Sequence, residues 1–227
     1  LQIRDIFAFL LKRFRNHVMN KYTLKVLGVL CGLVLGSCST VQKAVVEPVD
    51  YVNPYMGNIS HLLVPTYPTM HLPNGMLRVY PERDDYTGVR LRGLPVAVTS
   101  HRGSSAFSLS PYQGPASGLQ SVIRYSYDRE KITPYSYYVY LDEQEMDVHY
   151  GLSSQAALYE TNFGRQEDTY LVVSSRQGQL DWDGKALSGY QELANNTRIY
   201  VYIEPETQPT EVSVLHEGKL SAGTSAT

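Results

Sequence analysis

A hydroxyl, an imidazole and a guanidinium follow one another at Ser100, His101 and Arg102, within the stretch TSHRGSS at residues 99–105. A serine beside a histidine is the pairing that activates a nucleophile for acyl transfer. The stretch lacks the Gly-x-Ser-x-Gly elbow and the strand-to-helix context of serine hydrolases, so we do not expect such an enzyme. Two interpretations remain: His101 and Arg102 contact a polar ligand, or they belong to a structural hydrogen-bond cluster.

Paired carboxylates are a second chemistry to consider, because glycoside hydrolysis uses two of them at a set separation. The sequence offers Asp84 with Asp85, the acidic residues between 142 and 147, and Asp181 with Asp183. Each group stands in a turn or at the end of an expected strand, where solvated carboxylates are common. We therefore interpret them as loop carboxylates and predict no catalytic residue in this chain.

His61 and His71 flank a proline-containing segment that is not suited to a regular central strand. Together with His101 they are the candidates for a metal site, but their spacing matches no short metal-binding motif. We therefore predict no metal site in this chain. The only tryptophan, Trp182, precedes an Asp-Gly turn, and we expect it to pack beneath that hairpin rather than to serve as a platform for a sugar.

The stretch HLPNGMLRVYPERDDY at residues 71–86 combines a Pro-Asn-Gly turn, an alternating strand and a cluster of four charges at residues 82–85. Asn-Gly between alternating apolar residues is a strong hairpin signal, and charged residues often mark the solvated end of a strand. The pattern by itself favours a hairpin at the edge of a sheet. The alternative is that this stretch forms one wall of a binding site.

The N-terminus carries the pattern of an exported protein. We take Met19 as the start and interpret residues 1–18 as a translated upstream stretch. Residues 19–37 then begin with two lysines and continue into the apolar run 26–35. That run of ten residues falls short of the roughly 20 that a membrane-spanning helix needs, and it matches a signal peptide.

Gly36 and Ser37 precede Cys38 as in a bacterial lipobox, so we predict that Cys38 is lipidated and becomes the first mature residue. The alternative is an ordinary secretory signal with an incidental cysteine. The lipoprotein interpretation attaches the protein to the outer membrane through its lipid anchor, on the periplasmic or the cell-surface side.

Removal of residues 1–37 changes the charge and the cysteine content. It leaves 14 Lys and Arg against 21 Asp and Glu, a formal charge of −7. An acidic surface without basic runs argues against nucleic acid as a partner. Cys31 and Cys38 are the only cysteines, and Cys31 leaves with the signal, so the mature chain cannot form an internal disulfide.

Strand periodicity dominates residues 49–220, which follow a short tether at 38–48. In YSYYVYL (135–141) and RIYVYIE (198–204) apolar residues alternate with residues of the opposite face, and the run TYLVVSS (169–175) suits a central strand. No window shows a sustained helical stripe outside the signal. The fold class is therefore all-β, an antiparallel β-sandwich with few short helices, whose 19 tyrosines we expect at layer boundaries.

Several motifs resemble the N-terminal domain of glycoside hydrolase family 92. The matching residues are Asn53-Pro54-Tyr55-Met56-Gly57, His61, and Pro73-Asn74-Gly75-Met76 followed by Tyr80-Pro81-Glu82. TSHRGSS lies where the family has a Ser-His loop, and ITPYSYYVYLDEQEMDVHY resembles its strand pair. The family's glycine-rich turn is replaced here by NISHLLVPTYP, and Asn74 stands where Phe is usual, so we identify a divergent branch.

The resemblance implies a galactose-mutarotase-like supersandwich that supplies one wall of the cleft of a calcium-dependent, inverting exo-α-mannosidase of the Bacteroidetes type. In that family the general acid, the general base and the calcium ligands lie in a C-terminal (α/α)6 barrel, which is not among these 227 residues. The fragment is then expected to be inactive and to hold no cofactor. The cleft candidates in this chain are His61, Tyr67, His71, His101 and Arg102.

Three functional readings follow from the sequence. The first is a non-catalytic domain of a lipoprotein that acts on mannose-containing glycans, with residues 221–227 as a tail left by truncation. The second is a stand-alone surface lipoprotein that binds glycan or a partner without catalysis. The third is the unstable product of a decayed gene, whose bare interface exposes an apolar patch.

Overall fold

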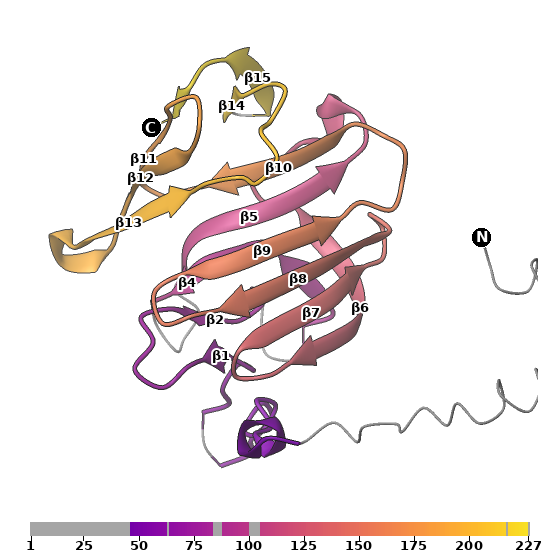
Figure 1. The fold of residues 1–227 in the computed structure, drawn as a ribbon, viewed down its shortest axis with the longest axis vertical. Coiled ribbons are helices and arrows are strands. Elements are labelled where there is room, and N and C mark those ends of the chain that lie inside the picture. The colour runs from indigo at the N-terminus through magenta and orange to yellow at the C-terminus, as the bar shows by residue number, and fades with distance from the viewer. Residues whose placement is uncertain (1–45, 63, 84–87, 100–104, 217, 227) are drawn as a thin grey trace, which may run out of the picture. The chain divides into compact units, whose positions relative to one another are not determined.

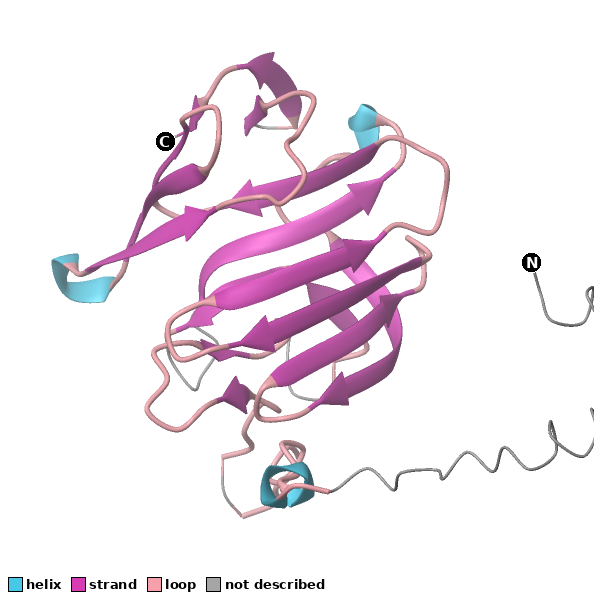
Figure 2. Cartoon of the chain, in the orientation of Figure 1, coloured by secondary structure: helices cyan, strands magenta, loops and turns pink. Residues whose placement is uncertain are grey.

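Strands make up nearly all regular structure in the computed structural model, which describes residues 46–62, 64–83, 88–99, 105–216 and 218–226. The chain divides into two compact units, Leu1–Val46 and Glu47–Thr227, and every element below belongs to the second. Figure 2 shows how little of that unit is helical. The described helices are short 3-10 segments: η2 (Pro48–Tyr51), η3 (Ala116–Gly118) and η4 (Ala194–Asn196).

The prediction of few and short helices is therefore confirmed for the described residues. No helix among them is long and apolar enough to cross a membrane.

The largest sheet of the described residues is antiparallel, with the strand order β3-β6-β7-β8-β9 (Figure 1). Its strands are β3 (Arg90–Arg92), β6 (Arg124–Ile132), β7 (Ser136–Leu141), β8 (Met146–Leu152) and β9 (Ala157–Asn162). In β7, Tyr137, Val139 and Leu141 are buried and the residues between them are only half-buried, which confirms the predicted alternation. This five-stranded sheet therefore turns one apolar face to the core.

The middle sheet has the order β10-β5-β4, with β4 (Leu94–Val98), β5 (Ser105–Gln113) and β10 (Thr169–Ser174). Nearly all of β5 is buried, because it lies between two strands and is covered on both faces. The prediction of a central strand at residues 169–175 was wrong, since among the described strands β10 pairs only with β5 and lies at the sheet edge. The apolar run in β10 does not reflect burial of both faces either, because its residues are exposed or half-buried.

The third sheet has the order β13-β12-β11-β16, with β11 (Gly178–Trp182), β12 (Leu187–Glu192), β13 (Arg198–Ile203) and β16 (Ser225–Ala226). Tyr200 and Tyr202 face solvent while Ile199, Val201 and Ile203 are half-buried, so the predicted alternation of β13 is confirmed. Two smaller hairpins complete the fold: β1 (Met70–His71) with β2 (Arg78–Val79), and β14 (Ser213–His216) with β15 (Lys219–Ala222).

Two short strands include most of the described closing residues. The strand β15 runs to Ala222, and β16 pairs with β11 through Leu180↔Ala226 and Asp181↔Ser225. Trp182 ends β11 directly before the turn to β12, as the hairpin prediction required, and its side chain is half-buried.

Two apolar clusters show that the middle sheet is the central layer. The first lies between the five-stranded sheet and the middle sheet, and includes Leu94 of β4, Val139 of β7 and Val148 of β8. The second joins Phe107 of β5 to Leu180 of β11, with residues of β12 and β13 packed against them. The all-β sandwich is thus extended to three layers.

The predicted hairpin is present at its described residues, because β1 pairs with β2 around a turn in which Asn74 has a positive φ of 57°. Its charged end is not solvated as the pattern suggested. Glu82 and Arg83 are each only 6% exposed, whereas Asp84 and Asp85 lie outside the described residues. The segment that follows the hairpin is therefore buried in the protein rather than exposed to solvent.

Burial of tyrosines makes the fold sensitive to alkaline pH. Burial is the largest cause that raises the pKa of seven described tyrosines, and it brings those of Tyr55 and Tyr80 to about 12. In the unfolded chain these phenols ionise near 10, so between pH 10 and pH 12 the unfolded state binds fewer protons than the folded state.

We expect the free energy of unfolding to fall steadily as pH rises through this window, and Tyr80→Phe to make the fall less steep. Urea denaturation at several pH values, with tyrosinate absorbance at 295 nm as a second signal, measures both effects. Tyr200→Phe, which removes the hydroxyl of an exposed ring, is the matched control. An unchanged slope in Tyr80→Phe would show that its buried phenol is not part of the effect.

Candidate functional site

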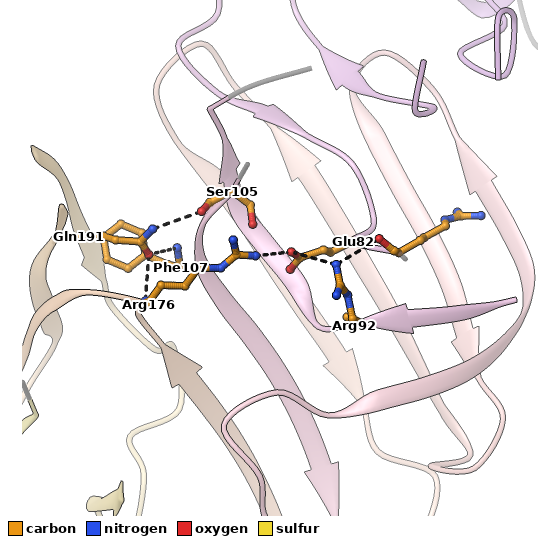
Figure 3. Close-up of polar contacts among 7 residues, drawn as sticks. Glu82, Arg92, Ser105, Phe107, Arg176 and Gln191 are labelled. Carbon is orange, nitrogen blue, oxygen red and sulfur yellow. Dashed lines mark hydrogen bonds and ion pairs between the residues drawn. The ribbon is translucent and has the colours of Figure 1, made fainter. Parts of the chain in front are cut away.

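A small pocket opens where the middle sheet meets the four-stranded sheet, and we call it the Glu82 pocket. Its volume is about 110 Å³. Figure 3 shows Gln191 and Arg176 approaching from one side and Glu82 and Arg92 from the other. The full lining is Glu82, Arg92, Ser105, Phe107, Ser108, Val122, Ser174, Arg176 and Gln191.

The carboxylate of Glu82 is the acidic group of the pocket and is held by two guanidinium groups. Arg176 Nη2 lies 2.5 Å from Glu82 Oε1, and Arg92 Nη2 lies 3.9 Å from the same oxygen. The Glu82 side chain is 7% exposed, whereas that of Arg176 is 61% exposed. The carboxylate is thus buried while one of its partners reaches solvent, so a ligand could displace Arg176 without burying an unpaired cation.

Glu82 and Arg83 are neighbours in an extended segment, so their side chains point to opposite sides. Arg83 forms a buried ion pair with Glu130 of β6, and Arg83 Nη1 donates a hydrogen bond of 2.6 Å to the Tyr127 hydroxyl. Burial lowers the pKa of the Arg83 guanidinium, but Glu130 outweighs that effect and the pKa is raised. Tyr137 also donates to Glu130 Oε1, at 3.2 Å. This network anchors the segment that carries Glu82.

The wall opposite Glu82 contains a break in the pairing of β4 with β5. Phe107 has a φ of 52°, and Val96 and Phe107 are missing from an otherwise regular register. The Phe107 N–H donates instead to Gln191 Oε1 at 3.0 Å, and the Val96 carbonyl accepts from the Tyr150 hydroxyl at 3.3 Å. A bulky residue in this region of φ costs on the order of 1–3 kcal/mol, and such strain concentrates at functional sites.

The Gln191 side chain forms hydrogen bonds with more than one backbone group of this wall. Its Nε2 donates to the Ser105 carbonyl at 3.2 Å, and its Oε1 also accepts from the Arg176 N–H at 3.4 Å. The side chain is 3% exposed. One buried amide from β12 therefore joins the strained strand β5 to the segment that carries Arg176.

Ser108 contributes a buried hydroxyl to the wall of the pocket. Ser108 Oγ has no hydrogen-bond partner among the described residues, although buried hydroxyls are normally paired. Gly93 lies against it, because a Cβ added there would stand 2.1 Å from Ser108 Oγ, and Gly93 has a φ of +67°. A glycine is required at this position on both counts.

The pocket therefore combines one carboxylate, guanidinium donors, a buried hydroxyl and the apolar side chains of Phe107 and Val122. Hydroxyl groups of a ligand can bond to the carboxylate and the guanidinium groups, while Phe107 and Val122 give an apolar contact. Drug-sized ligands occupy pockets of about 300–1,000 Å³. A volume of about 110 Å³ suits only one edge of a larger molecule.

The residues that we predicted from the sequence lie elsewhere in the described structure. His61 and His71 are exposed, and the His71 N–H donates to the Pro134 carbonyl at 2.9 Å. The Tyr67 ring stacks on that of Tyr80, with 4.6 Å between centroids. None of the three lines the Glu82 pocket.

His101, Arg102 and Cys38 lie outside the described residues. Ser105, the last residue of the TSHRGSS stretch, does line the pocket. Within the described parts of the chain, no group of three or more His, Cys, Asp or Glu could hold a metal ion.

Sequence reasoning did not identify Glu82, Arg92, Arg176 or Gln191 as site residues. Glu82 carried one signal, since it ends the Tyr80-Pro81-Glu82 motif. Arg176 and Gln191 carried none, because their contacts join residues 94 positions apart for Glu82–Arg176 and 84 apart for Phe107–Gln191. Such pairings follow from the stacking of the sheets and leave no local pattern.

Comparisons with known proteins agree with this geometry. Residues 51–227 match the model of the glycosyl hydrolase family 92 N-terminal domain. Two similar solved structures are of the family GH92 alpha-mannosidase BT3965 from Bacteroides thetaiotaomicron, and the second of them is a complex with mannoimidazole. No curated protein matches the chain.

Both similar structures share 16% sequence identity with this chain, at TM-scores of 0.65 and 0.64. At this identity the similarity supports the fold alone. The match covers 78% of this chain and 29% of the mannosidase chain, so this chain spans less than a third of its relative's length.

Replacement of Gln191 by Leu should destabilise the domain, because it removes the hydrogen bonds that its side chain makes to the buried Phe107 N–H and to the Ser105 carbonyl. We expect a loss of about 1–3 kcal/mol in the free energy of unfolding, measured by urea denaturation. The Phe107 amide should also exchange its hydrogen faster than in the unmodified protein.

Gln208→Leu is the matched control, because Gln208 is exposed and its side chain bonds only to the carbonyls of Lys185 and Pro205. Equal stabilities of the two variants would contradict the role of Gln191 in holding the strained strand.

Proposed function

The chain belongs to glycosyl hydrolase family 92, and on that premise we propose that it is the non-catalytic N-terminal domain of a lipoprotein α-mannosidase. The observation that carries the proposal is the match over residues 51–227, to which the three-layer sandwich corresponds. The Glu82 pocket is then part of the wall that this domain presents to the substrate of the complete enzyme.

The chemistry of the pocket supports a binding role rather than a catalytic one. An inverting glycosidase needs two carboxyl groups about 6.5–9.5 Å apart, one as acid and one as base. The lining of the Glu82 pocket holds one carboxylate, and two guanidinium groups keep it paired. Glu82 is therefore suited to accept hydrogen bonds from ligand hydroxyls and not to transfer a proton.

The complete enzyme would hydrolyse α-mannosidic linkages of mannose-containing glycans with inversion and with calcium. Support for the substrate comes from the solved relative, which is an α-mannosidase and has been crystallised with mannoimidazole. We propose that the acid, the base and the calcium ligands lie in a C-terminal (α/α)6 barrel. The residues described here would then orient the glycan at the edge of the cleft.

A second function is favoured by the outer face of the four-stranded sheet. Tyr200 and Tyr202 lie two positions apart on β13 and are 71% and 61% exposed. Next to them, Arg198 Cζ lies 4.3 Å from the centre of the Tyr190 ring. Exposed aromatic rings with polar groups around them are suited to sugar rings, so the domain would be a glycan-binding surface lipoprotein without catalysis.

The purified mature protein should release no mannose from aryl α-mannosides, with calcium or with a chelator, because its pocket lacks an acid and base pair. The assay is release of the chromophore, with the Bacteroides thetaiotaomicron mannosidase as the positive control. Saturable, chelator-sensitive release by this chain would contradict the proposal.

Titration calorimetry of the same preparation with mannose oligosaccharides separates the two functions. Saturable heats that disappear in Tyr200→Ala but persist in Tyr170→Ala, a half-buried tyrosine of β10, would favour the stand-alone binding protein. Heats that remain at the level of dilution in all three proteins would count against it.

Location in the outer membrane is part of the proposal and depends on Cys38. We expect Cys38→Ala to abolish labelling by radioactive palmitate and to stop partition into the detergent phase of Triton X-114. Cys31→Ala is the matched control, since that cysteine lies within the proposed signal peptide and should leave both signals unchanged. Equal labelling of the two variants would show that the signal is not a lipobox.

A further inference from the structure

Exposed apolar side chains concentrate in one part of the chain. Of the 19 large apolar residues exposed among the described positions, eight lie between residues 49 and 64. Leu62 is 95% exposed, Met56 76% and Ile59 69%. Single exposed apolar residues need no explanation, but a contiguous group of this kind marks a surface that binds something.

This segment lies at one end of the five-stranded sheet. The Tyr135 hydroxyl, at the turn between β6 and β7, donates to Asp50 Oδ1 at 2.9 Å. The Tyr55 hydroxyl donates to the carbonyl of Glu130, near the end of β6, at 3.4 Å. Figure 1 shows the indigo segment next to that end of the sheet.

The hairpin β1–β2 extends the same surface. The Met76 N–H, in the turn of that hairpin, donates to the Ser154 carbonyl at 2.7 Å, and Ser154 lies in the turn between β8 and β9. In the antiparallel order β6-β7-β8-β9 this turn stands at the same end of the sheet as the β6–β7 turn. Met76 is 77% exposed. We call residues 49–62 and Val64 together with Met76 the apolar end surface.

Internal hydrogen bonds give the apolar end surface a defined shape. Asp50 also accepts from the Glu47 N–H at 3.0 Å, which closes the first turn of η2. The Thr66 N–H donates to the Gly57 carbonyl at 2.9 Å, which folds the segment back on itself. An apolar surface with a fixed shape is suited to specific protein contact.

The charge composition of residues 47–77 indicates which kind of surface could cover the apolar end surface. Residues 47–77 contain no Lys or Arg, and their two carboxylates are Glu47 and Asp50. Segments that bind anionic membranes are rich in Lys and Arg, so a lipid surface is a poor match. An uncharged, apolar protein surface is the occupant that fits.

The similar mannosidase chain is longer than this chain, since the match covers 29% of it and 78% of this chain, so a complete protein of that length has further polypeptide that could cover the surface. We propose that the apolar end surface binds the remaining polypeptide of the complete family 92 protein, a proposal that rests on the proposed function. Its eight exposed apolar side chains between residues 49 and 64 and Met76 are then buried in the complete protein.

Methionine oxidation tests this directly, because the described methionines fall into two classes. Met56 and Met76 are 76% and 77% exposed on the apolar end surface, while Met70 and Met146 are 2% and 0% exposed in the core. The experiment oxidises the 227-residue chain expressed alone and, in parallel, the native protein extracted from its source membranes. Peptide mass spectrometry reads the rates, and intact mass gives the length of the native product.

We expect a native product longer than this chain, in which Met56 and Met76 oxidise several-fold more slowly than in the isolated chain. Met70 and Met146 should stay slow in both preparations, and hydroxyl-radical labelling of exposed Tyr200 should be equal. A longer product in which Met56 and Met76 oxidise at the isolated rate would overturn the inference and leave the proposed function intact. A native product no longer than this chain would remove the proposed function, and the inference with it.

Two further outcomes would assign the surface to other occupants and so overturn the proposal. Protection that grows with the concentration of the isolated chain would mean that a second copy covers the surface. Protection of the isolated chain by phosphatidylglycerol vesicles would mean a lipid surface.

A pair of exposed variants keeps the test independent of folding. Leu62→Ser should leave the stability of the isolated chain unchanged, because Leu62 makes few contacts there, and should lower the unfolding midpoint of the longer native protein. Val89→Ser is the control, since Val89 is 81% exposed and stands directly before β3. Equal midpoints for the two variants in the longer protein would contradict the proposed contact.

Discussion

The packing of the three sheets on one another depends on one irregular position in the central layer. Where β4 and β5 fail to pair at Val96 and Phe107, both backbone groups lie inside the protein and cannot be left without hydrogen bonds. Tyr150 from the five-stranded sheet bonds to one, and Gln191 from the four-stranded sheet bonds to the other. The interruption of the ladder is therefore also the point where polar side chains lock the outer sheets onto the middle sheet.

The same position explains why the pocket has the composition it has. Because Phe107 leaves the regular pleat, Ala106 and Phe107 both pack into the second apolar cluster although they are consecutive residues. The strand thereby keeps an apolar wall beside the buried carboxylate of Glu82. On the other side, the ion pair of Arg83 with Glu130 fixes the segment that carries Glu82. The polar pocket is thus held in place on one side by the irregular strand at Phe107 and on the other by the ion pair of Arg83 with Glu130.

Much of the fold could be predicted from the sequence, because alternation in β7 and β13 reports directly which side chains face a core. The hairpin at Asn74-Gly75 was equally readable from local turn chemistry. The predictions that failed are those that depend on how the sheets stack on one another. The edge position of β10 and the burial of Glu82 and Arg83 depend on partners far along the chain, and a carboxylate beside an arginine looks the same in a solvated loop as in a buried network. The motif around Glu82 could be recognised only through resemblance to a family.

The long sequence separation of the pocket residues has a consequence for how the domain folds. Glu82 and Arg176 meet across 94 positions of the chain, and no local hairpin can bring them together early. Contacts of such separation require large loops to close first, and all-β proteins dominated by them fold slowly. The pocket should therefore be among the last features to form during synthesis and folding. Intermediates that have lost the outer four-stranded sheet would keep most of their secondary structure but lack Gln191, the residue of that sheet that lines the pocket.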